Sequence, residues 1–341
     1  MPSSIPAPLA AYIADCLTPD SQTLVTSVLS TPAPWLCLRL LYAGLYGVED
    51  SARHTEQTGH EVIFVSLLRP LSLWTEMGKK MGLDLPSLLK SRRVRYIDGL
   101  AGGTTSSTMS TGSATAESDP QQLPTTRLKS MALKDIRDAL DGVLKTPSIS
   151  TPSTGSSATP LSSSTSTTGS ARGGALTPRI PTAAATRSFS PAAGRPTIYI
   201  DGIDFLLASQ PAISTVELQS FLATLRSKCH ALMLACQADS PLLHSSSTTS
   251  PDAGTPLERN HAHFITSLAH STRWLFQLRG LDTGSANDIS GVIRVSRGGD
   301  DSIEFGPNEG QDKNHVQDLV DAEWLYQLKG DGSVRVWARG E

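Results

Sequence analysis

The hydrophobic and polar positions of the chain follow two alternating patterns. Short, nearly continuous apolar runs, typical of buried strands, occupy residues 22–29, 60–68, 94–100, 197–201 and 231–237. Between them, apolar residues recur every three or four positions, which predicts helices over residues 34–47, 71–81, 86–91, 214–230 and 257–270. Strands that are apolar on both sides and separated by helices predict a parallel sheet that helices cover on both faces.

The last seventy residues change character. Four strand-like runs, RWLFQLRG, GVIRVSRGG, AEWLYQLKG and SVRVWARG, contain glycine at their ends and leave no room for crossover helices. They predict an antiparallel or mixed extension on one edge of the parallel sheet. The predicted fold class is therefore α/β, with a mostly parallel sheet and an antiparallel C-terminal edge, in a single domain over residues 1–341.

Two segments are predicted to be disordered insertions in this domain, residues 101–126 and 146–196. They consist mainly of Ser, Thr, Ala, Gly and Pro, so burial could not offset the entropy lost on ordering them. The segment between them, residues 127–145, is predicted to be a helix that belongs to the fold. Its apolar residues recur at helical spacing: Leu128, Ala132, Ile136, Leu140 and Leu144.

Composition narrows the functional classes. The chain has 29 Lys and Arg against 32 Asp and Glu, a net charge of -3, so any contact with nucleic acid must use a local patch. Its four cysteines form no C-x-x-C pair and are expected to be buried, reduced thiols. The first residues lack the features of a secretory or mitochondrial signal, and no apolar run reaches the ~20 residues that span a bilayer. These features predict a soluble protein of the cytoplasm or nucleus with no membrane partner.

Asp201 suggests a nucleotide site. It follows the apolar run Ile198 to Ile200, where many nucleotide-hydrolysing sheets hold Mg²⁺ beside a phosphate. Such a site also needs a loop of the form G-x-x-x-x-G-K-[ST] after the first strand, whose backbone N–H groups close on the phosphates. The residues in that place read STPAPWL, with two prolines that lack N–H groups, no glycine and no lysine.

A second requirement also fails. A carboxylate that activates water often follows the second strand, but Ser66 and Arg69 stand there instead. We therefore expect no autonomous ATP hydrolysis, no catalytic residue and no cofactor. Two interpretations of Asp201 remain open: it ends a buried strand with its carboxylate bonded to turn N–H groups, or it is a vestigial or partner-completed metal position.

Other chemistries are not supported by the sequence. His261 and His263 lie two positions apart on a predicted helix and so point to different faces, and His270 has no ligand at metal-binding spacing. No G-x-S-x-G motif occurs, so a serine hydrolase has no nucleophile. We predict no metal site.

Five segments together resemble the family of the sixth subunit of the Elongator complex. They are HEVIFVSLLRPLSLWTEMGKKMGLDL, VRYIDGL, TIYIDGIDFLLAS, LMLACQADSPLL and LRGLDTGSANDISGVIRVSRGG. The resemblance implies a RecA-like ATPase fold that has lost its phosphate loop. It also implies a six-membered ring with two copies each of the fourth, fifth and sixth subunits, which joins the catalytic Elongator subcomplex and engages tRNA during wobble-uridine modification. It carries no catalytic residue over to this chain.

Two basic segments are candidates for contacts with tRNA or neighbouring subunits. The run KSRRVRY contributes Lys90, Arg92, Arg93 and Arg95, and the segment 278–299 contributes Arg279, Arg294 and Arg297. Ordinary solvated turns and hairpins would show the same pattern. Trp35, Trp74, Trp324 and Trp337 are expected to be core or interface anchors.

The sequence leaves two other functions open. One is a RecA-like ATPase subunit whose site is completed by a neighbouring chain. The other is a recombination-mediator paralogue that binds single-stranded DNA.

Overall fold

The computed structural model describes residues 5–48, 61–100, 123–145, 194–210, 212–239, 243, 254–281, 284, 286, 288–300 and 319–340. The helices are α1 (Ala7–Cys16), α2 (Pro34–Tyr46), α3 (Leu71–Lys80), α4 (Leu85–Lys90), α5 (Leu133–Lys145), α6 (Phe205–Ser209), α7 (Thr215–Arg226) and α9 (Pro256–Ser271). The strands are β1 (Ser21–Ser27), β2 (Val62–Ser66), β3 (Val94–Asp98), β4 (Thr125–Arg127), β5 (Thr197–Asp201), β6 (Ala231–Gln237), β7 (Trp274–Arg279), β8 (Gly291–Arg297), β9 (Ala322–Leu328) and β10 (Val334–Trp337).

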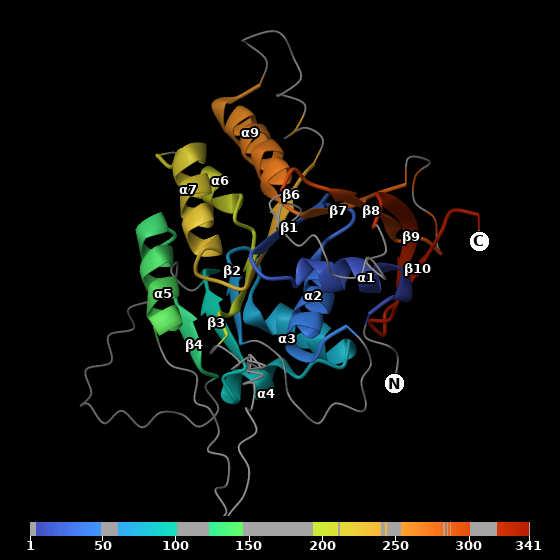
Figure 1. Ribbon diagram of the computed structural model, residues 1–341, viewed down its shortest axis with the longest axis horizontal. Coiled ribbons are helices and arrows are strands. Elements are labelled where there is room, and N and C mark those ends of the chain that lie inside the picture. Colours follow the sequence, from blue (N-terminus) through green and yellow to red (C-terminus); the bar gives the residue numbers. More distant parts are fainter. Residues whose placement is uncertain are drawn as a thin grey trace, which may run out of the picture. The chain divides into compact units, whose positions relative to one another are not determined.

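The described strands form one sheet in the order β10-β9-β8-β7-β1-β6-β5-β2-β3-β4 (Figure 1). Every pair from β7 to β4 is parallel. The pairs β7 with β8, β8 with β9 and β9 with β10 are antiparallel. The prediction of a mostly parallel sheet, flanked by helices and extended by an antiparallel C-terminal edge, is confirmed.

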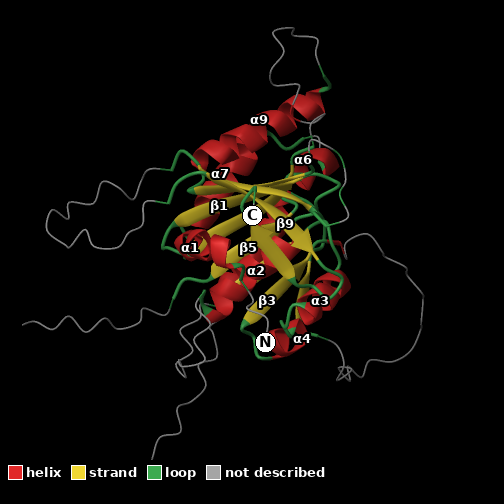
Figure 2. Ribbon diagram, turned by 90° about the vertical axis from the view of Figure 1, so that its right-hand side faces the viewer, coloured by secondary structure: helices red, strands yellow, loops and turns green. Residues whose placement is uncertain are grey.

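Helices lie on both faces of the sheet (Figure 2), and a hydrophobic cluster lies under the helices of each face. One contains side chains of α1 to α4, and the other contains side chains of α5, α6, α7 and α9. Successive residues of a strand point to opposite faces, so Tyr199 joins the first cluster while Ile198 and Ile200 join the second. Asp201, two residues after Tyr199, therefore lies on the α1 to α4 side.

Helix α2 shows how the first cluster is packed. It begins at Pro34, whose missing N–H costs nothing in the first turn, and ends before Gly47, whose φ is 86°. In its third turn, Gly44 faces the Tyr199 hydroxyl, which donates a hydrogen bond of 2.7 Å to Leu40 O. A Cβ on Gly44 would lie 2.7 Å from that hydroxyl oxygen, so the helix approaches β5 as closely as it does because this residue has no side chain.

Several boundaries differ from the sequence-based expectations. Residues 125–127 form β4 beside β3, so the predicted insertion 101–126 extends too far, and α5 begins at Leu133 rather than at residue 127. Arg195, assigned to the insertion 146–196, is described and pairs with Asp20 at 2.8 Å. Helices α1 and α6 were not predicted. The remainder of the two predicted insertions, residues 101–122 and 146–193, lies outside the described residues.

The cysteine and tryptophan expectations can also be compared with the structure. All four cysteines are free, and Cys16, Cys229 and Cys236 are buried as expected, whereas Cys37 is only partly so. Burial raises the pKa of the Cys16 thiol to about 12. Trp35 and Trp74 are core residues, with at most 1 % of their surface exposed, while Trp324 and Trp337 are partly exposed. Within the described part of the chain, no helix combines the length and apolar composition needed to cross a membrane.

Candidate functional site

Asp201 is the last residue of β5 and lies beside Ser66, the last residue of β2. The chain then turns through Gly202, whose φ is 80°. A Cβ at Gly202 would lie 2.3 Å from Leu68 Cγ, so both the conformation and the space require glycine there. This turn fixes Asp201 at the carboxyl edge of the sheet, where the sequence predicted it.

The Asp201 carboxylate is bonded to side chains of the β2–α3 connection. Arg69 Nη1 pairs with Oδ1, and Ser66 Oγ lies 3.1 Å from Oδ2. Ser66 Oγ also receives the Trp74 indole N–H at 3.0 Å and lies 2.7 Å from Arg69 O, so its single proton has two possible acceptors. The expectation that Asp201 bonds turn N–H groups was therefore wrong: Gly202 N–H donates to Ala235 O instead.

The electrostatics of this group follow from its burial. Asp201 is 2 % exposed, and burial raises the pKa of its carboxyl from 3.8 to about 6, although the Arg69 charge and the Ser66 hydrogen bond oppose the rise. The Arg69 guanidinium pairs directly with this carboxylate. A cation at this position is thus supplied by the chain itself.

The loop after β1 is closed in a way that leaves no phosphate cradle. Thr31 N–H donates to Val28 O at 2.9 Å, and Leu29 N–H donates to Asp239 Oδ1 at 3.0 Å. At the start of α2, the N–H groups of residues 36 and 37 both donate to Ala33 O. Trp35 turns inward and packs on Tyr326, with ring centroids 5.1 Å apart. Four backbone N–H groups of this loop and the helix start are therefore already bonded within the chain, and the two prolines have none to offer a phosphate.

The space beside Asp201 is also small. A cavity of about 10 Å³ lies between β5, β6 and α2, lined by apolar side chains together with Asp201. Such a volume holds at most one water molecule. This cavity therefore has no room for a nucleotide or for a hydrated Mg²⁺.

A second carboxylate of the same turn, Asp204, was not singled out from the sequence. Its Oδ2 accepts the Gln237 N–H at 3.2 Å and lies 3.4 Å from His261 Nε2 on α9, so it joins β6, α6 and α9. The second Asp of the segment DGID is the sequence feature that could have pointed to Asp204. His261 is buried and His263 is exposed, which confirms that the two point to different faces. No group of three potential metal ligands occurs among the described residues.

The basic run 90–96 divides into internal and surface residues. Arg93 Nη2 donates to Leu45 O at 2.6 Å, and its guanidinium lies 4.9 Å from the centre of the Tyr46 ring. Arg95 pairs with Glu61 and donates to Val143 O. Lys90 and Arg92 are exposed, with Arg92 at a φ of 58°. Two of the four, Arg93 and Arg95, therefore hold parts of the fold together, whereas contact of this run with tRNA or a neighbouring subunit stays a prediction.

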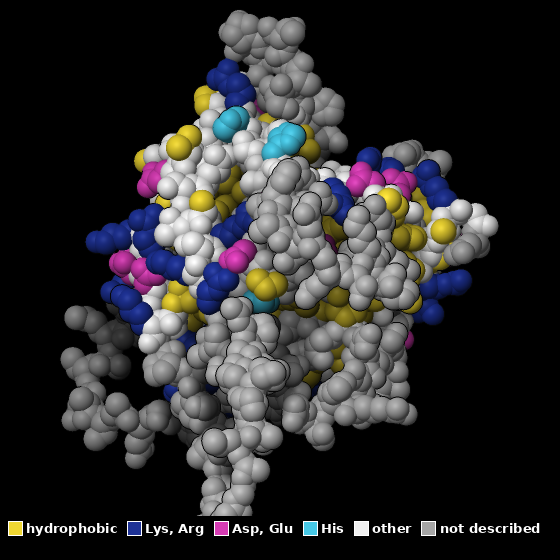
Figure 3. Space-filling view, in the orientation of Figure 1, with side chains coloured by type: hydrophobic (Ala, Val, Ile, Leu, Met, Phe, Trp, Pro, Cys, Tyr) yellow, Lys and Arg dark blue, Asp and Glu magenta, His cyan; other side chains and the backbone are white. Residues whose placement is uncertain are grey.

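The arginines of the second basic segment, residues 278–299, lie on two different faces of the sheet, because successive side chains of a strand alternate between faces. Arg279 and Arg294 lie on the same face of the sheet as α9, and Arg279 pairs with Glu323 at 3.0 Å. Arg297 lies on the opposite face, with its guanidinium 5.5 Å from the centre of the Trp274 ring. Elsewhere on the molecule, Lys and Arg side chains over α5 and α7 are interspersed with acidic ones (Figure 3). Only Arg279 and Arg294 of this set are thus brought onto one surface.

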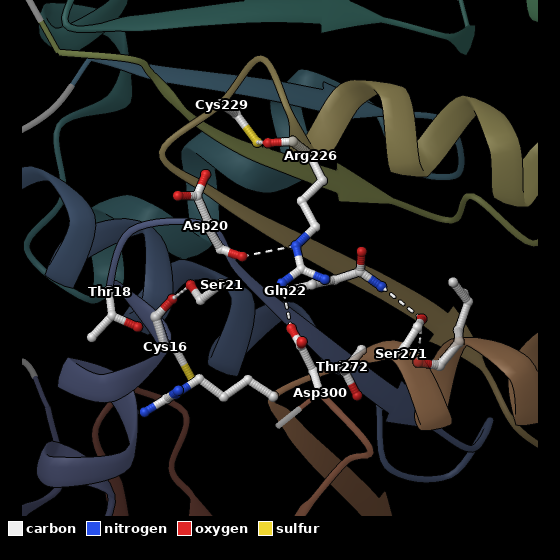
Figure 4. Close-up of polar contacts among 12 residues, drawn as sticks. Cys16, Thr18, Asp20, Ser21, Gln22, Arg226, Cys229, Ser271, Thr272 and Asp300 are labelled. Carbon is white, nitrogen blue, oxygen red and sulfur yellow. Dashed lines mark hydrogen bonds and ion pairs between the residues drawn. The ribbon is translucent and has the colours of Figure 1, made fainter. Parts of the chain in front are cut away.

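A hollow of about 530 Å³ lies at the opposite, amino-terminal edge of the sheet, between α7 and α9. Figure 4 shows the polar contacts of four of its lining residues, Asp20, Gln22, Arg226 and Ser271. Arg226 donates to Asp20 O at 2.7 Å and pairs with Asp300, while Gln22 Nε2 donates to Ser271 Oγ at 3.1 Å. These contacts join the ends of four elements, which is a structural role.

Comparison with known proteins adds little. No protein-family model matches the chain, and no curated protein matches it. Among solved structures, a KaiC-like protein from the hyperthermophilic archaeon Pyrococcus horikoshii is similar over 98% of this chain and 97% of that chain, with 13% sequence identity and a TM-score of 0.45. So distant a likeness decides neither the activity nor the partners of this chain.

Proposed function

We propose that this chain is a non-catalytic, RecA-like subunit of an Elongator-type complex, corresponding to its sixth subunit. In this role it joins the fourth and fifth subunits in a heterohexameric ring, which binds tRNA and supports modification of the wobble uridine by the catalytic subcomplex. The family, the partners and the cytoplasmic or nuclear location rest on the resemblance of the five sequence segments.

The main support for the non-catalytic assignment comes from the contacts and surroundings of the Asp201 carboxylate. Its two carboxylate oxygens face Arg69 and Ser66, the adjacent cavity is about 10 Å³, and the loop after β1 is closed. An ATPase needs an open carboxylate, a metal ion and free backbone donors at this edge. The same observation argues against an ATP site completed by a neighbour, because the Asp201 carboxylate is already paired with Arg69 of its own chain.

Assembly is tested by co-expression. The full chain, produced together with the fourth and fifth Elongator subunits, should elute as a heterohexamer with two copies of each subunit by light scattering. Thermal unfolding of the separate chain establishes that it is folded. A folded chain that stays monomeric with both partners present would contradict the proposal.

The non-catalytic role is tested in cells that lack the endogenous subunit. Asp201→Asn keeps the shape of the side chain and removes its charge, so it should restore wobble-uridine modification as fully as the unchanged chain. Modified nucleosides are quantified from purified tRNA by mass spectrometry. Failure of a soluble, ring-forming D201N protein to restore modification would show that Asp201 performs chemistry.

A further inference from the structure

Arg39 on α2 is a buried cation without an anionic partner. The residue is 4 % exposed, and its Nη2 donates a long hydrogen bond of 3.3 Å to Gly332 O. Its Nε is buried without an acceptor, and no carboxylate of the described residues lies within 4 Å of the guanidinium. Four other partly buried arginines each pair with a carboxylate: Arg69 with Asp201, Arg95 with Glu61, Arg226 with Asp300 and Arg273 with Asp15.

An unpaired guanidinium in this position is unfavourable. Burial lowers the pKa of Arg39, but an arginine side chain keeps its proton in proteins, so the charge remains. One carbonyl oxygen satisfies only one of the five N–H groups of the side chain. A buried charge that lacks a counter-ion and most of its hydrogen bonds destabilises the fold. An anion bound to Arg39 would remove this cost.

The guanidinium lies beside the turn that joins β9 to β10. The turn is held together by its own hydrogen bonds, from Lys329 N–H to Ser333 O at 3.0 Å and from Gly332 N–H to Lys329 O at 2.9 Å. Gly332 also lies against α3, since a Cβ on it would be 2.8 Å from Lys80 Cβ. The long bond from Arg39 is the hydrogen bond that joins this turn to α2. A small shift of the turn as a unit would let an anion replace Gly332 O.

A second donor without an acceptor lies on the same face of α2. Trp35 stands four residues before Arg39, so the two side chains are neighbours on the helix surface. The Trp35 indole N–H is buried and makes no hydrogen bond of normal geometry with the described residues. The Tyr326 hydroxyl is near it: burial raises the pKa of Tyr326 to about 12, and Trp35 opposes that rise. Both unmatched groups are donors, so a ligand here must supply acceptors.

The charges around the turn favour a singly charged anion. Lys80, which lies against Gly332, already pairs with Glu76 at 3.1 Å, and the Asp331 side chain is bonded within its own turn. Arg39 therefore leaves one positive charge uncompensated. A phosphate group carries more than one negative charge near neutral pH and would leave an excess. A carboxylate carries one, and its two oxygens match the planar guanidinium.

We propose that Arg39 is the centre of a binding site for a small monocarboxylate of the size of acetate. The carboxylate lies between α2 and the β9–β10 turn, beside the Trp35 N–H, and accepts hydrogen bonds from the guanidinium in place of Gly332 O. The low exposure of Arg39 restricts the site to a small ligand. The site uses no group that contacts Asp201 and does not depend on the proposed function.

Acetate is the probe, and the full chain is studied at about pH 7.5, where acetate is ionised. Thermal unfolding is followed while sodium acetate replaces sodium chloride at constant ionic strength, and saturation-transfer NMR detects bound acetate directly. At ten times its dissociation constant, acetate should raise the unfolding temperature by about 3–6 °C.

Three variants separate a specific site from a general salt effect. Arg39→Met should abolish the shift and the NMR signal, and in chloride it should be at least as stable as the unchanged chain, because an unpaired buried charge is gone. Arg39→Lys keeps the charge without the planar group and should bind acetate more weakly. Arg137→Met removes an exposed arginine of α5 that lies over Phe221, and it should leave the shift unchanged.

Four results would overturn the proposal. Acetate could fail to bind the unchanged chain, or its effect could persist in the R39M protein. Phosphate at the same ionic strength could produce an Arg39-dependent shift as large as that of acetate. The R39M protein could also be unfolded, or markedly less stable in chloride, which would show that Gly332 O already satisfies the guanidinium. The R39K protein gives an independent result, since acetate binding equal to that of the unchanged chain would contradict a paired carboxylate.

Discussion

Asp201→Asn should change how the stability of the protein depends on pH. A raised carboxyl pKa means that the native state holds its proton more tightly than the unfolded chain does. Stability attributable to Asp201 is therefore fully present below pH 3.8 and is lost as the pH rises to about 6. The difference between the two pKa values corresponds to about 3 kcal/mol of stability, at about 1.4 kcal/mol per pKa unit. Solvent screening does not reduce this free energy, because the Asp201 side chain is buried.

Urea unfolding of the unchanged chain and of D201N, followed by circular dichroism between pH 4 and 7.5, measures this effect. Other carboxyl groups titrate over the same range, but they do so in both proteins and cancel in the difference. Relative to D201N, the unchanged chain should lose about 2.4 kcal/mol in free energy of unfolding between pH 4 and 7, slightly less than the full value because pH 4 already lies above the unfolded pKa. Parallel curves, or a relative gain with rising pH, would refute the reasoning that burial dominates over the Arg69 charge.

Gly44→Ala should lower the free energy of unfolding by about 1–3 kcal/mol because its Cβ meets the Tyr199 hydroxyl. In a Tyr199→Phe background the same change should be neutral or stabilising, and additivity in a double-mutant cycle would exclude the contact. Arg95→Ala should destabilise the fold by about 1–3 kcal/mol, whereas Arg92→Ala should change thermal stability little; equal effects would contradict their different burial. Gly202→Ala should cost more than about 2 kcal/mol by urea unfolding, and a neutral result would show that the turn can move.

Periodicity predicts most of this fold because its strands are uniformly apolar. The five parallel strands expected from the sequence all occur, and Asp201 ends β5 where the apolar run stops. The short strand β4 has only three residues, partly exposed or exposed, and so gave no apolar signal. Helix α5 begins later than its helical spacing suggests because Arg127 pairs with β3 and Leu128 N–H donates to Asp98 O at the end of that strand.

The candidate site was less accessible to sequence reasoning. Ser66 and Arg69 were noted only as substitutes for a catalytic carboxylate, because their contact with Asp201 depends on the pairing of β2 with β5, more than 130 positions apart. The sequence could have shown that Arg294 and Arg297 lie on opposite faces of the sheet, since residues three apart on a strand point to opposite faces. Arg93 and Arg95 gave no such signal, because their partners lie in distant segments.

The shared hydroxyl of Ser66 gives the protein a built-in optical probe. Trp74 donates its indole N–H to Ser66 Oγ, whose proton can turn toward Arg69 O or toward Asp201. Ionisation of the carboxylate with an apparent midpoint near pH 6 should draw that proton toward it and change the field at the indole. The emission of one tryptophan, isolated by subtracting the spectrum of a Trp74→Phe protein, would then report the charge on Asp201 without any added label.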